Sequence, residues 1–325
     1  MSEEKKSLNF ALVGAAGFVA PRHMKAISET GNRLVAALDP YDGVGIMDSF
    51  FPEADFFTEP ERFDRHLDKL RRQGEKGEPG RKVDYVSICS PNYLHDAHIR
   101  MALRNDANAI CEKPIVLNPW NIDALSEIEK ESGRRVNTIL QLRLHPAIIA
   151  LREQVMKQPA TKPYEFDLTY ITSRGHWYHR SWKGDVEKSG GVATNIGIHF
   201  FDMLIWIFGE VKESIVHVLT EEKAAGYLQL KNASVRWFLS IDYQDIPDEV
   251  KKTGKRTYRT LTLDNKEIEF SEGFTNLHTL SYQEILKGNG FGLNDARASV
   301  VLAHQIRTAQ PKGLTGDIHP FLKKI

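Results

Sequence analysis

The chain has 325 residues, of which 41% are hydrophobic and 26% charged, an ordinary composition for a globular protein with room for two domains. Lys and Arg together number 43, as do Asp and Glu, so no overall basic field is present to attract nucleic acid. The two cysteines, Cys89 and Cys111, are too few for a disulfide framework or a cysteine metal cluster. The N-terminal stretch lacks the apolar core of a signal peptide, and no run reaches the ~20 apolar residues of a membrane helix. We therefore expect a cytoplasmic protein with neither a nucleic-acid nor a membrane partner.

Short apolar strands alternate with amphipathic helices over the first 140 residues. We expect strands at 10–13, 34–38, 85–89, 109–111 and 136–140, helices at 22–30, 61–72, 94–104 and 119–132, and a polar loop at 75–82. This alternation predicts an α/β domain over residues 1–140, with a doubly wound parallel sheet of the Rossmann kind.

After residue 141 the pattern changes, and strands come to dominate. We expect helices at 146–157, 195–208 and 294–308, and strands at 164–172, 214–219, 227–230, 235–241, 256–263 and 267–270. In the strand at 235–241, Val235, Trp237, Leu239 and Ile241 share one face, which is typical of a half-buried antiparallel strand. Residues 141–325 are thus predicted to form an α+β domain with an open, largely antiparallel sheet.

A glycine-containing turn joins the first strand to the first helix. The segment GAAGFVA, residues 14–20, reads G-x-x-G-x-x-A instead of the usual G-x-G-x-x-G dinucleotide fingerprint. Its small residues still allow a pyrophosphate to approach the backbone at a helix N-terminus. The cofactor-binding residues expected here are Gly14, Ala16, Gly17, Phe18 and Val19.

Other cofactor-binding candidates follow later strands. Asp39 ends the second strand, where an acid accepts hydrogen bonds from ribose hydroxyls and repels a 2′-phosphate, so NAD is favoured over NADP. The alternative is that Asp39 is only a turn residue before Pro40. At the end of the strand at 85–89 we expect cofactor contacts from Ser90, Pro91, Asn92 and His95. His95 and His98 have a spacing that also suits a metal, but no further ligand accompanies them, so no metal site is predicted.

The segment AICEKPIVL, residues 109–117, places a lysine where a buried strand ends. The carboxyl edge of such a sheet is the cofactor crevice, so Glu112 and Lys113 are predicted to lie beside the cofactor. A lysine next to an oxidised nicotinamide meets a like charge, which favours its neutral form and suits it to proton transfer. The alternative is an ordinary surface lysine in a strand-to-loop turn.

The helix expected at 195–208 follows Gly190–Gly191 and carries a row of polar groups. Asn195, His199 and Asp202 are spaced i, i+4 and i+7, on one helix face. The alternative is a buried helix with a satisfied core histidine. We predict instead that this row belongs to a site.

Four segments together resemble the Gfo/Idh/MocA family of nicotinamide-dependent sugar oxidoreductases: GAAGFVAPRH, SPNYLHDAH, CEKP and GGVATNIGIHFFDML. The resemblance implies a Rossmann domain followed by an α/β domain whose open sheet often forms a dimer or tetramer interface. It also implies that Lys113 and His199 flank the hydroxyl being oxidised. Asn195 stands where many relatives have aspartate, and an amide cannot act as a base. His199, Lys113 or both must therefore move the proton, and Asn195 would orient the substrate.

Within the family, the segments VGAAGFVAPRHMKAI, VAALDPYDGVGIMDSFFPEADFFTE and CEKPIVLNPWN resemble the UDP-N-acetylglucosaminuronate dehydrogenases of bacterial lipopolysaccharide and O-antigen sugar synthesis. The resemblance implies oxidation of the sugar 3-hydroxyl to a ketone, with NAD as cofactor and a homotetramer as assembly. Some such relatives retain NADH and regenerate NAD with a second substrate, so 2-oxoglutarate is a further expected partner.

The segment 169–185 interleaves aromatic residues with cations. Because an arginine can hold a carboxylate through two parallel bonds, Arg174 is predicted to bind the uronate, with Arg143 and Tyr178 lining the same site. An ordinary amphipathic strand and loop is the alternative. Alternative functions are a free-sugar or cyclitol dehydrogenase, and a non-catalytic, NAD-binding regulator that responds to a sugar.

Overall fold

The computed structural model describes residues 7–78, 82–157, 163–263, 266–267 and 276–324. The chain divides into two compact units. Unit 1 contains Met1–Val116, Trp120–Gln141 and Thr275–Ala296, and unit 2 contains Leu117–Pro119, Leu142–Phe274 and Arg297–Ile325. Two segments depart from the boundary expected at residue 140, because Leu117–Pro119 belongs to unit 2 and Thr275–Ala296 belongs to unit 1.

Unit 1 is built on a six-stranded parallel sheet in the order β3-β2-β1-β4-β5-β6. The strands are β1 (Asn9–Val13), β2 (Arg33–Leu38), β3 (Asp55–Phe57), β4 (Tyr85–Ile88), β5 (Asn108–Cys111) and β6 (Val136–Thr138). The strand order reverses between β1 and β4, which is the point where such sheets bind ligands at their carboxyl ends. The predicted doubly wound parallel sheet is confirmed, and the short strand β3 is an addition to it.

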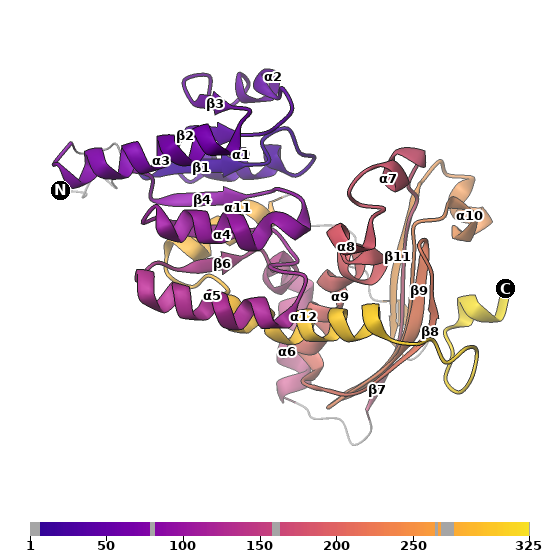
Figure 1. Ribbon diagram of the computed structural model, residues 1–325. Helices are drawn as coiled ribbons and strands as arrows, with labels where there is room; N and C mark the ends of the chain where they lie inside the picture. The colour runs from indigo at the N-terminus through magenta and orange to yellow at the C-terminus, as the bar shows by residue number, and fades with distance from the viewer. Residues whose placement is uncertain (1–6, 79–81, 158–162, 264–265, 268–275, 325) are drawn as a thin grey trace. The chain divides into compact units, whose positions relative to one another are not determined.

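Helices follow most strands of unit 1 (Figure 1). They are α1 (Ala20–Glu29), α2 (Val44–Met47), α3 (Pro60–Glu75), α4 (His95–Arg104) after a 3-10 turn at Asn92–Leu94, and α5 (Pro119–Ser132). In α3, Pro60 occupies the first turn and Phe63, Leu67 and Leu70 form the buried stripe. Part of the polar loop expected at 75–82, residues 79–81, lies outside the described residues.

One helix of unit 1, α11 (Leu277–Leu286), comes from late in the chain and was missed by sequence reasoning. It lies among the earliest elements of the chain (Figure 1). Its Tyr282 and Ile285 join Phe10, Met24 and Ile27 in one buried cluster. Five of its six buried residues follow a helical spacing: Leu277, His278, Ser281, Tyr282 and Ile285.

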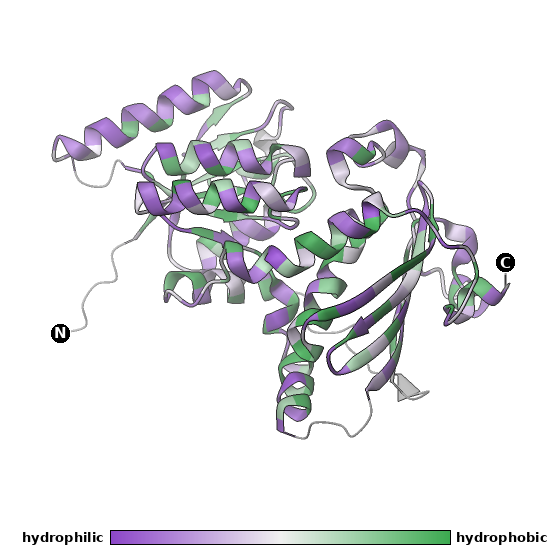
Figure 2. Cartoon of the chain, turned by 60° about the horizontal axis from the view of Figure 1, so that its bottom comes forward, coloured by the Kyte–Doolittle hydropathy of each residue, from purple (hydrophilic) through white to green (hydrophobic). Residues whose placement is uncertain are grey.

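Unit 2 contains a second six-stranded sheet, in the order β12-β11-β7-β10-β9-β8. The strands are β7 (Tyr164–Thr172), β8 (Val211–Leu219), β9 (Lys223–Leu230), β10 (Ala233–Ser240), β11 (Thr257–Leu263) and β12 (Lys266–Glu267). Among the described strands of this sheet only β10 and β7 pair in parallel, so the predicted, largely antiparallel open sheet is confirmed. Its strands carry hydrophilic and hydrophobic residues along their length (Figure 2). Of the strand expected at 267–270, residues 268–270 lie outside the described residues.

The helices of unit 2 are α6 (Pro146–Lys157), α7 (His176–Arg180), α8 (Val186–Ser189), α9 (Ile198–Phe208), α10 (Asp248–Lys251) and the greater part of α12 (Leu293–Thr308). Short 3-10 turns lie at Gln141–Leu144, Tyr243–Asp245 and Pro320–Lys324. The helix α9 packs on the sheet, where the rings of Phe201 and Trp237 contact edge to face with their centres 5.3 Å apart. It is preceded by a π-helical turn, Ala193–Gly197, which replaces the start of the regular helix expected from residue 195.

The helical run Val186–Phe208 departs from the expectation that no segment has the length and apolarity of a membrane helix. By length and composition alone it is apolar enough to cross a membrane, with a mean hydropathy of 1.4 in its most apolar window. Of that window, 72% is buried inside the protein, as is usual for a core helix. Among the described residues no other helix meets the same criterion.

Candidate active site

The turn between β1 and α1 approaches the end of β4 closely. Gly14 has φ +86°, and a Cβ added there would lie 2.7 Å from the carbonyl carbon and oxygen of Cys89. Only glycine fits this position without displacing backbone. The turn then closes with a hydrogen bond from the amide of Gly17 to the carbonyl of Gly14, at 3.0 Å.

The N-terminus of α1 is suited to an anion. No side chain caps this helix, and its first turn contains no acidic residue. Pro21 has no amide hydrogen, and the amides of Ala20 and Arg22 already donate to carbonyls of the preceding turn, so an anion here would meet the positive end of the helix dipole. Ala16, Gly17 and Val19 are half-buried here, and Phe18 is 85% exposed. This cradle of small side chains at the positive end of the helix dipole fits a dinucleotide pyrophosphate.

Asp39 ties the end of β2 to the same turn. One carboxylate oxygen accepts from the amide of Ala16 and the other from the amide of Tyr41, both at 2.9 Å. The side chain is therefore more than a turn residue before Pro40. A carboxylate has further lone pairs, so ribose binding stays a prediction that this geometry permits.

The buried ring of His95 links the turn after β4 to the turn that contains Pro114. Its Nδ1 lies 2.6 Å from the carbonyl oxygen of Pro114, and its Nε2 lies 2.9 Å from that of Ser90. The ring is fully buried with both nitrogens engaged, so it links two turns rather than offering an atom to a ligand. The direct cofactor contact expected of His95 is thus not favoured by the structure.

The neighbouring groups of this turn are also engaged. His98 contacts the hydroxyl of Ser90 through Nδ1 at 2.8 Å. Burial, reinforced by His95, lowers the pKa of His98 to about 4, which keeps its ring neutral. Ser90 and Asn92 are buried and Pro91 is half-buried, all at the carboxyl end of β4, where a cofactor contact was predicted.

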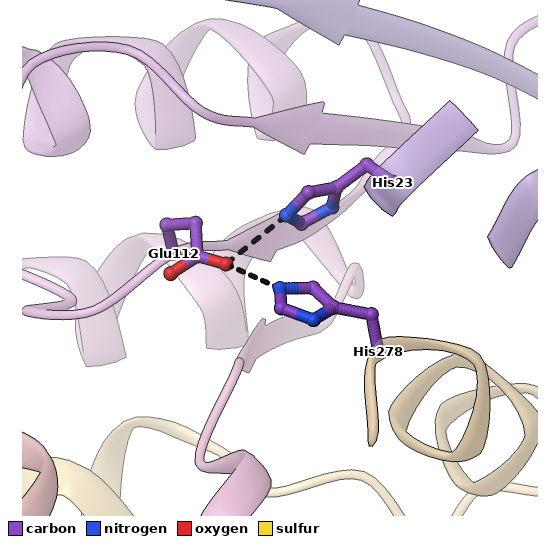
Figure 3. A group of neighbouring side chains, drawn as sticks. All are labelled: His23, Glu112 and His278. Carbon is purple, nitrogen blue, oxygen red and sulfur yellow. Dashed lines mark hydrogen bonds and ion pairs between the residues drawn. The ribbon is translucent and has the colours of Figure 1, made fainter. Parts of the chain in front are cut away.

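Glu112, directly after β5, is the centre of a buried cluster that the sequence did not predict (Figure 3). Its Oε1 lies 3.1 Å from Nε2 of His23 on α1 and 2.9 Å from Nε2 of His278 on α11. Nδ1 of His23 contacts the hydroxyl of Tyr282 at 2.8 Å, and that hydroxyl contacts Ser87 at 2.6 Å. His23 stands inside a quoted motif, but nothing in the local sequence paired it with residues of α11.

The three groups His23, Glu112 and His278 could also hold a metal ion by position, since their ligand atoms lie within 4.8 Å of one another. Sequence analysis predicted no metal site. The hydrogen bonds engage both Nε2 atoms and the carboxylate, which are the same atoms that would ligate an ion.

The charges in this cluster follow from burial and hydrogen bonding. Burial opposes ionisation of Glu112, but hydrogen bonds from His23 and His278 outweigh it and hold its pKa well below the usual range. For His23, burial lowers the pKa and dominates over the hydrogen bond to Glu112. The carboxylate is therefore ionised and the His23 ring neutral near pH 7.

Lys113 is half-buried at the carboxyl end of the sheet. Its backbone amide donates to Oε2 of Glu112 at 3.2 Å, and the Lys113–Pro114 peptide bond is cis. The lysine thus extends from a backbone position that Glu112 holds in place.

In unit 2, Asn195 and His199 stand out by exposure. Within the run 192–204 every other residue is buried, and these two are half-buried. Asn195 donates through Nδ2 to the hydroxyl of Tyr178 at 2.8 Å. Tyr178 itself is only 1% exposed, and burial raises its pKa, so it serves as a neutral support for Asn195.

Asp202 departs from the row of polar groups expected on α9. Its carboxylate is buried against the guanidinium of Arg143, at 2.9 and 2.7 Å. Because the π-helical turn precedes α9, the regular spacing that placed Asn195 and Asp202 on one face does not hold. Arg143, also buried, is engaged by this pair, and its expected contact with substrate stays a prediction.

An exposed patch near α7 combines cations with aromatic rings. Arg174 is exposed, and Nζ of Lys183 lies 5.0 Å from the ring centre of Trp177 and 5.6 Å from that of Trp182. Burial, and then the charge of Arg174, lowers the pKa of Lys183. One cation over aromatic faces with a second cation nearby suits an anionic, ring-containing ligand.

Two family models match this chain. The model of the oxidoreductase family with an NAD-binding Rossmann fold, GFO_IDH_MocA, covers residues 8–139. The model of the family's C-terminal alpha/beta domain covers residues 161–246.

Solved structures resemble the whole chain. The WlbA (WbpB) dehydrogenase of Thermus thermophilus in complex with NAD and alpha-ketoglutarate is 52% identical, with a TM-score of 0.91 over 97% of this chain and 99% of that one. The same enzyme in complex with NAD and UDP-GlcNAcA is 51% identical with the same TM-score and coverage.

Curated relatives match in part: a 2,7-anhydro-N-acetylneuraminate hydratase of Mediterraneibacter gnavus is 27% identical over 65% of this chain and 52% of that protein. The chain spans about a third to a half of the curated relatives that it matches first. The chain belongs to the Gfo/Idh/MocA family of NAD-binding oxidoreductases.

Proposed function

We propose that the protein is an NAD-dependent dehydrogenase that oxidises the 3-hydroxyl of UDP-N-acetylglucosaminuronic acid to a ketone. The observation that carries this proposal is the similarity, at 51% identity over 97% of the chain, to a dehydrogenase solved with NAD and UDP-GlcNAcA. At this identity and coverage the fold, the cofactor site and the substrate class are expected to be shared.

The cofactor site of unit 1 fits NAD. The uncapped N-terminus of α1 would hold the pyrophosphate, and Asp39 would accept hydrogen bonds from a ribose. The turns that contain Ser90 and Lys113 end β4 and β5 and would face the other half of the dinucleotide. NAD, when bound, supplies the acceptor for the hydride that leaves C3 of the sugar.

The remaining chemistry is the removal of one proton from the sugar hydroxyl. We assign it to His199 with help from Lys113, because Asn195 cannot accept a proton at neutral pH. The two groups belong to different compact units, so their pairing rests on the family resemblance. Asn195, held by Tyr178, would orient the hydroxyl through its amide.

The substrate carries a uronate and a diphosphate, both anionic. The exposed Arg174 and the neighbouring Lys183 would supply the opposing charge, and Trp177 would offer a face for ring stacking. Arg143 is the weaker candidate, because its guanidinium already holds Asp202.

The relative solved with alpha-ketoglutarate suggests how the cofactor is reoxidised. We propose that 2-oxoglutarate is reduced to 2-hydroxyglutarate, so that NADH returns its hydride without leaving the protein. In this cycle the sugar loses two electrons and two protons, and the 2-oxo acid gains them.

One experiment separates this function from its alternatives. Purified protein is mixed with NAD and, separately, UDP-N-acetylglucosaminuronic acid, UDP-N-acetylglucosamine, myo-inositol and free glucose, with and without 2-oxoglutarate. Absorbance at the NADH band is followed together with mass spectrometry of the sugar. We expect a 3-keto product only with the UDP-uronate, in catalytic yield when 2-oxoglutarate is present. A product from inositol or glucose alone would reassign the substrate, and binding without any product would indicate a regulator.

We further propose a cytoplasmic homotetramer that supplies an oxidised sugar nucleotide for lipopolysaccharide synthesis. The mass of the particle in solution, measured by light scattering after size exclusion, tests the assembly directly. A monomer at micromolar concentration would contradict it.

A further inference from the structure

The cluster around Glu112 joins three elements that are far apart in the sequence. His23 comes from α1, Glu112 follows β5, and His278 comes from α11 (Figure 3). All three side chains are at most 10% exposed. A carboxylate this deeply buried is costly unless its charge is met by hydrogen bonds or has a use.

The hydrogen bonds of the cluster determine where its protons lie. Since the His23 ring is neutral, its Nε2–H donates to Glu112, and its Nδ1 accepts from Tyr282. Ser87 must then donate to the hydroxyl of Tyr282. His278 needs only a single Nε2–H for its own bond to Glu112. The contacts thus make Glu112 the acceptor of each hydrogen bond that reaches it, which is the role of an ionised carboxylate.

The position of that charge relates it to the cofactor. In a doubly wound sheet each half binds one half of the dinucleotide at the carboxyl ends of its strands. Asp39 ends β2 in the first half, and Glu112 follows β5 in the second. The second half is the one expected to bind nicotinamide, whose ring is positively charged when oxidised and neutral when reduced.

The same carboxylate also holds the backbone that bears Lys113. Its Oε2 accepts from the amide of Lys113 at 3.2 Å, while its Oε1 is fixed by the two histidines. A displacement of the Glu112 carboxylate would therefore move the residue that follows it.

We propose that Glu112 is a positioning residue that fixes Lys113 and, through its buried negative charge, makes the protein bind NAD⁺ in preference to NADH, with His23 and His278 maintaining that charge. The inference rests on the proposed function only in taking NAD as the cofactor. It adds a thermodynamic role to a buried cluster whose side chains are bonded to one another.

The test is the ratio of two dissociation constants, measured by titrating NAD⁺ and NADH into the full-length protein without any sugar. For Glu112→Gln we expect NAD⁺ binding to weaken about tenfold while NADH binding changes less than about twofold, because only the oxidised ring interacts with the lost charge. Glu112→Met removes the charge without adding a donor and should shift the ratio in the same direction. The two variants together keep the test decisive if one of them folds poorly.

Two further variants separate charge from general damage. Glu112→Asp retains the charge and should retain the ratio. Tyr282→Phe breaks the hydrogen bonds to His23 and Ser87 in the same cluster but removes no charge, so it should lower stability and leave the ratio unchanged.

An equal weakening of NAD⁺ and NADH in Glu112→Gln and Glu112→Met would overturn the proposal, because it would indicate a structural role alone. So would stoichiometric zinc bound by the wild-type protein and lost in these variants, since Glu112 would then be a metal ligand. Failure of the wild-type protein to oxidise UDP-N-acetylglucosaminuronic acid counts against the proposed function only, because the ratio is measured without sugar.

Discussion

The guanidinium of Arg143 and the carboxylate of Asp202 form a bidentate ion pair inside unit 2. Nε lies 2.9 Å from Oδ2 and a terminal nitrogen lies 2.7 Å from Oδ1, with both side chains at most 7% exposed. The pair connects the 3-10 turn at Gln141–Leu144 to α9, the helix whose first turn contains His199. A residue expected to bind substrate thus has a structural partner.

This pair predicts the behaviour of Arg143→Met. The variant leaves Asp202 as an unpaired buried charge, so the free energy of unfolding should fall by about 3–5 kcal/mol in urea denaturation. The double variant Arg143→Met/Asp202→Leu should recover most of that loss, because it removes both charges. If Arg143 served only the substrate, the single variant would raise KM and leave stability unchanged.

The catalytic assignment predicts that Lys113→Ala and His199→Ala each reduce turnover about 10²-fold or more, since each removes a proton-handling group. NAD binding, measured by titration, should stay within about threefold of wild type for His199→Ala. Lys25→Ala, on the exposed face of α1, is the matched control and should be fully active. Near-normal turnover in both catalytic variants would contradict the assignment.

Asp39 should determine which cofactor is bound. Its charge favours ribose hydroxyls and opposes a 2′-phosphate, so Asp39→Ser should weaken NAD binding about tenfold and reduce the preference over NADP. The two dissociation constants are measured side by side. Because Asp39 also accepts from the amides of Ala16 and Tyr41, a purely structural role would weaken both cofactors equally, and that result would refute the ribose contact.

The turn after β1 should not tolerate a side chain at Gly14. Alanine there would need a positive φ and would place Cβ 2.7 Å from the backbone of Cys89, so stability should fall by at least about 2 kcal/mol, with loss of NAD affinity. Gly45→Ala is the control, because its added Cβ meets nothing within 4 Å. Equal melting temperatures for the two variants would show that the turn is able to move.

Acid should destabilise unit 2 through His319. Its Nδ1 accepts from the amide of Phe321 at 3.1 Å and its Nε2 contacts the hydroxyl of Thr169 at 3.2 Å. Burial, followed by the charge of Arg236, lowers its pKa to about 3. The unfolded chain therefore binds this proton first, and the stability present above about pH 6.5 is lost progressively as the pH falls toward 3.

Between pH 6.5 and pH 5 this single group should contribute a loss of about 2 kcal/mol. Urea denaturation at the two pH values measures it, and His319→Gln should show a smaller drop than wild type. His176→Gln, at an exposed position, is the control and should follow the wild-type curve. Identical pH dependence in all three proteins would exclude His319 as the source.

Sequence reasoning reached most of the fold because the signals were local. Each strand of the first sheet except β3 was a short apolar run, and each predicted helix had its own amphipathic period. The helix α11 was missed although five of its six buried residues, Leu277, His278, Ser281, Tyr282 and Ile285, follow a helical period. Two of those five residues, His278 and Ser281, are polar. His278 is satisfied by Glu112, and Ser281 by the carbonyl of Leu277 in its own helix.

For the site, the sequence identified the turns but not the contacts between them. The motif around Lys113 was evident, whereas the partners of Glu112 lie 89 and 166 residues away along the chain. Arg143 and Asp202 lie 59 residues apart along the chain. The π-helical turn before α9 has no sequence pattern that distinguishes it from a regular helix. Such features arise from packing, which a single sequence does not encode locally.

Because α11 completes the cluster that contains Phe10, Met24 and Ile27, the nucleotide-binding half of this protein is not a contiguous piece of the gene. A fragment ending at residue 140 would expose that apolar surface to water and leave Glu112 without His278. An autonomous cofactor-binding module would require residues 276–296 to be joined back to it, for example by a short linker after residue 141. During synthesis, the core of unit 1 therefore cannot be completed until nearly the entire chain has been made.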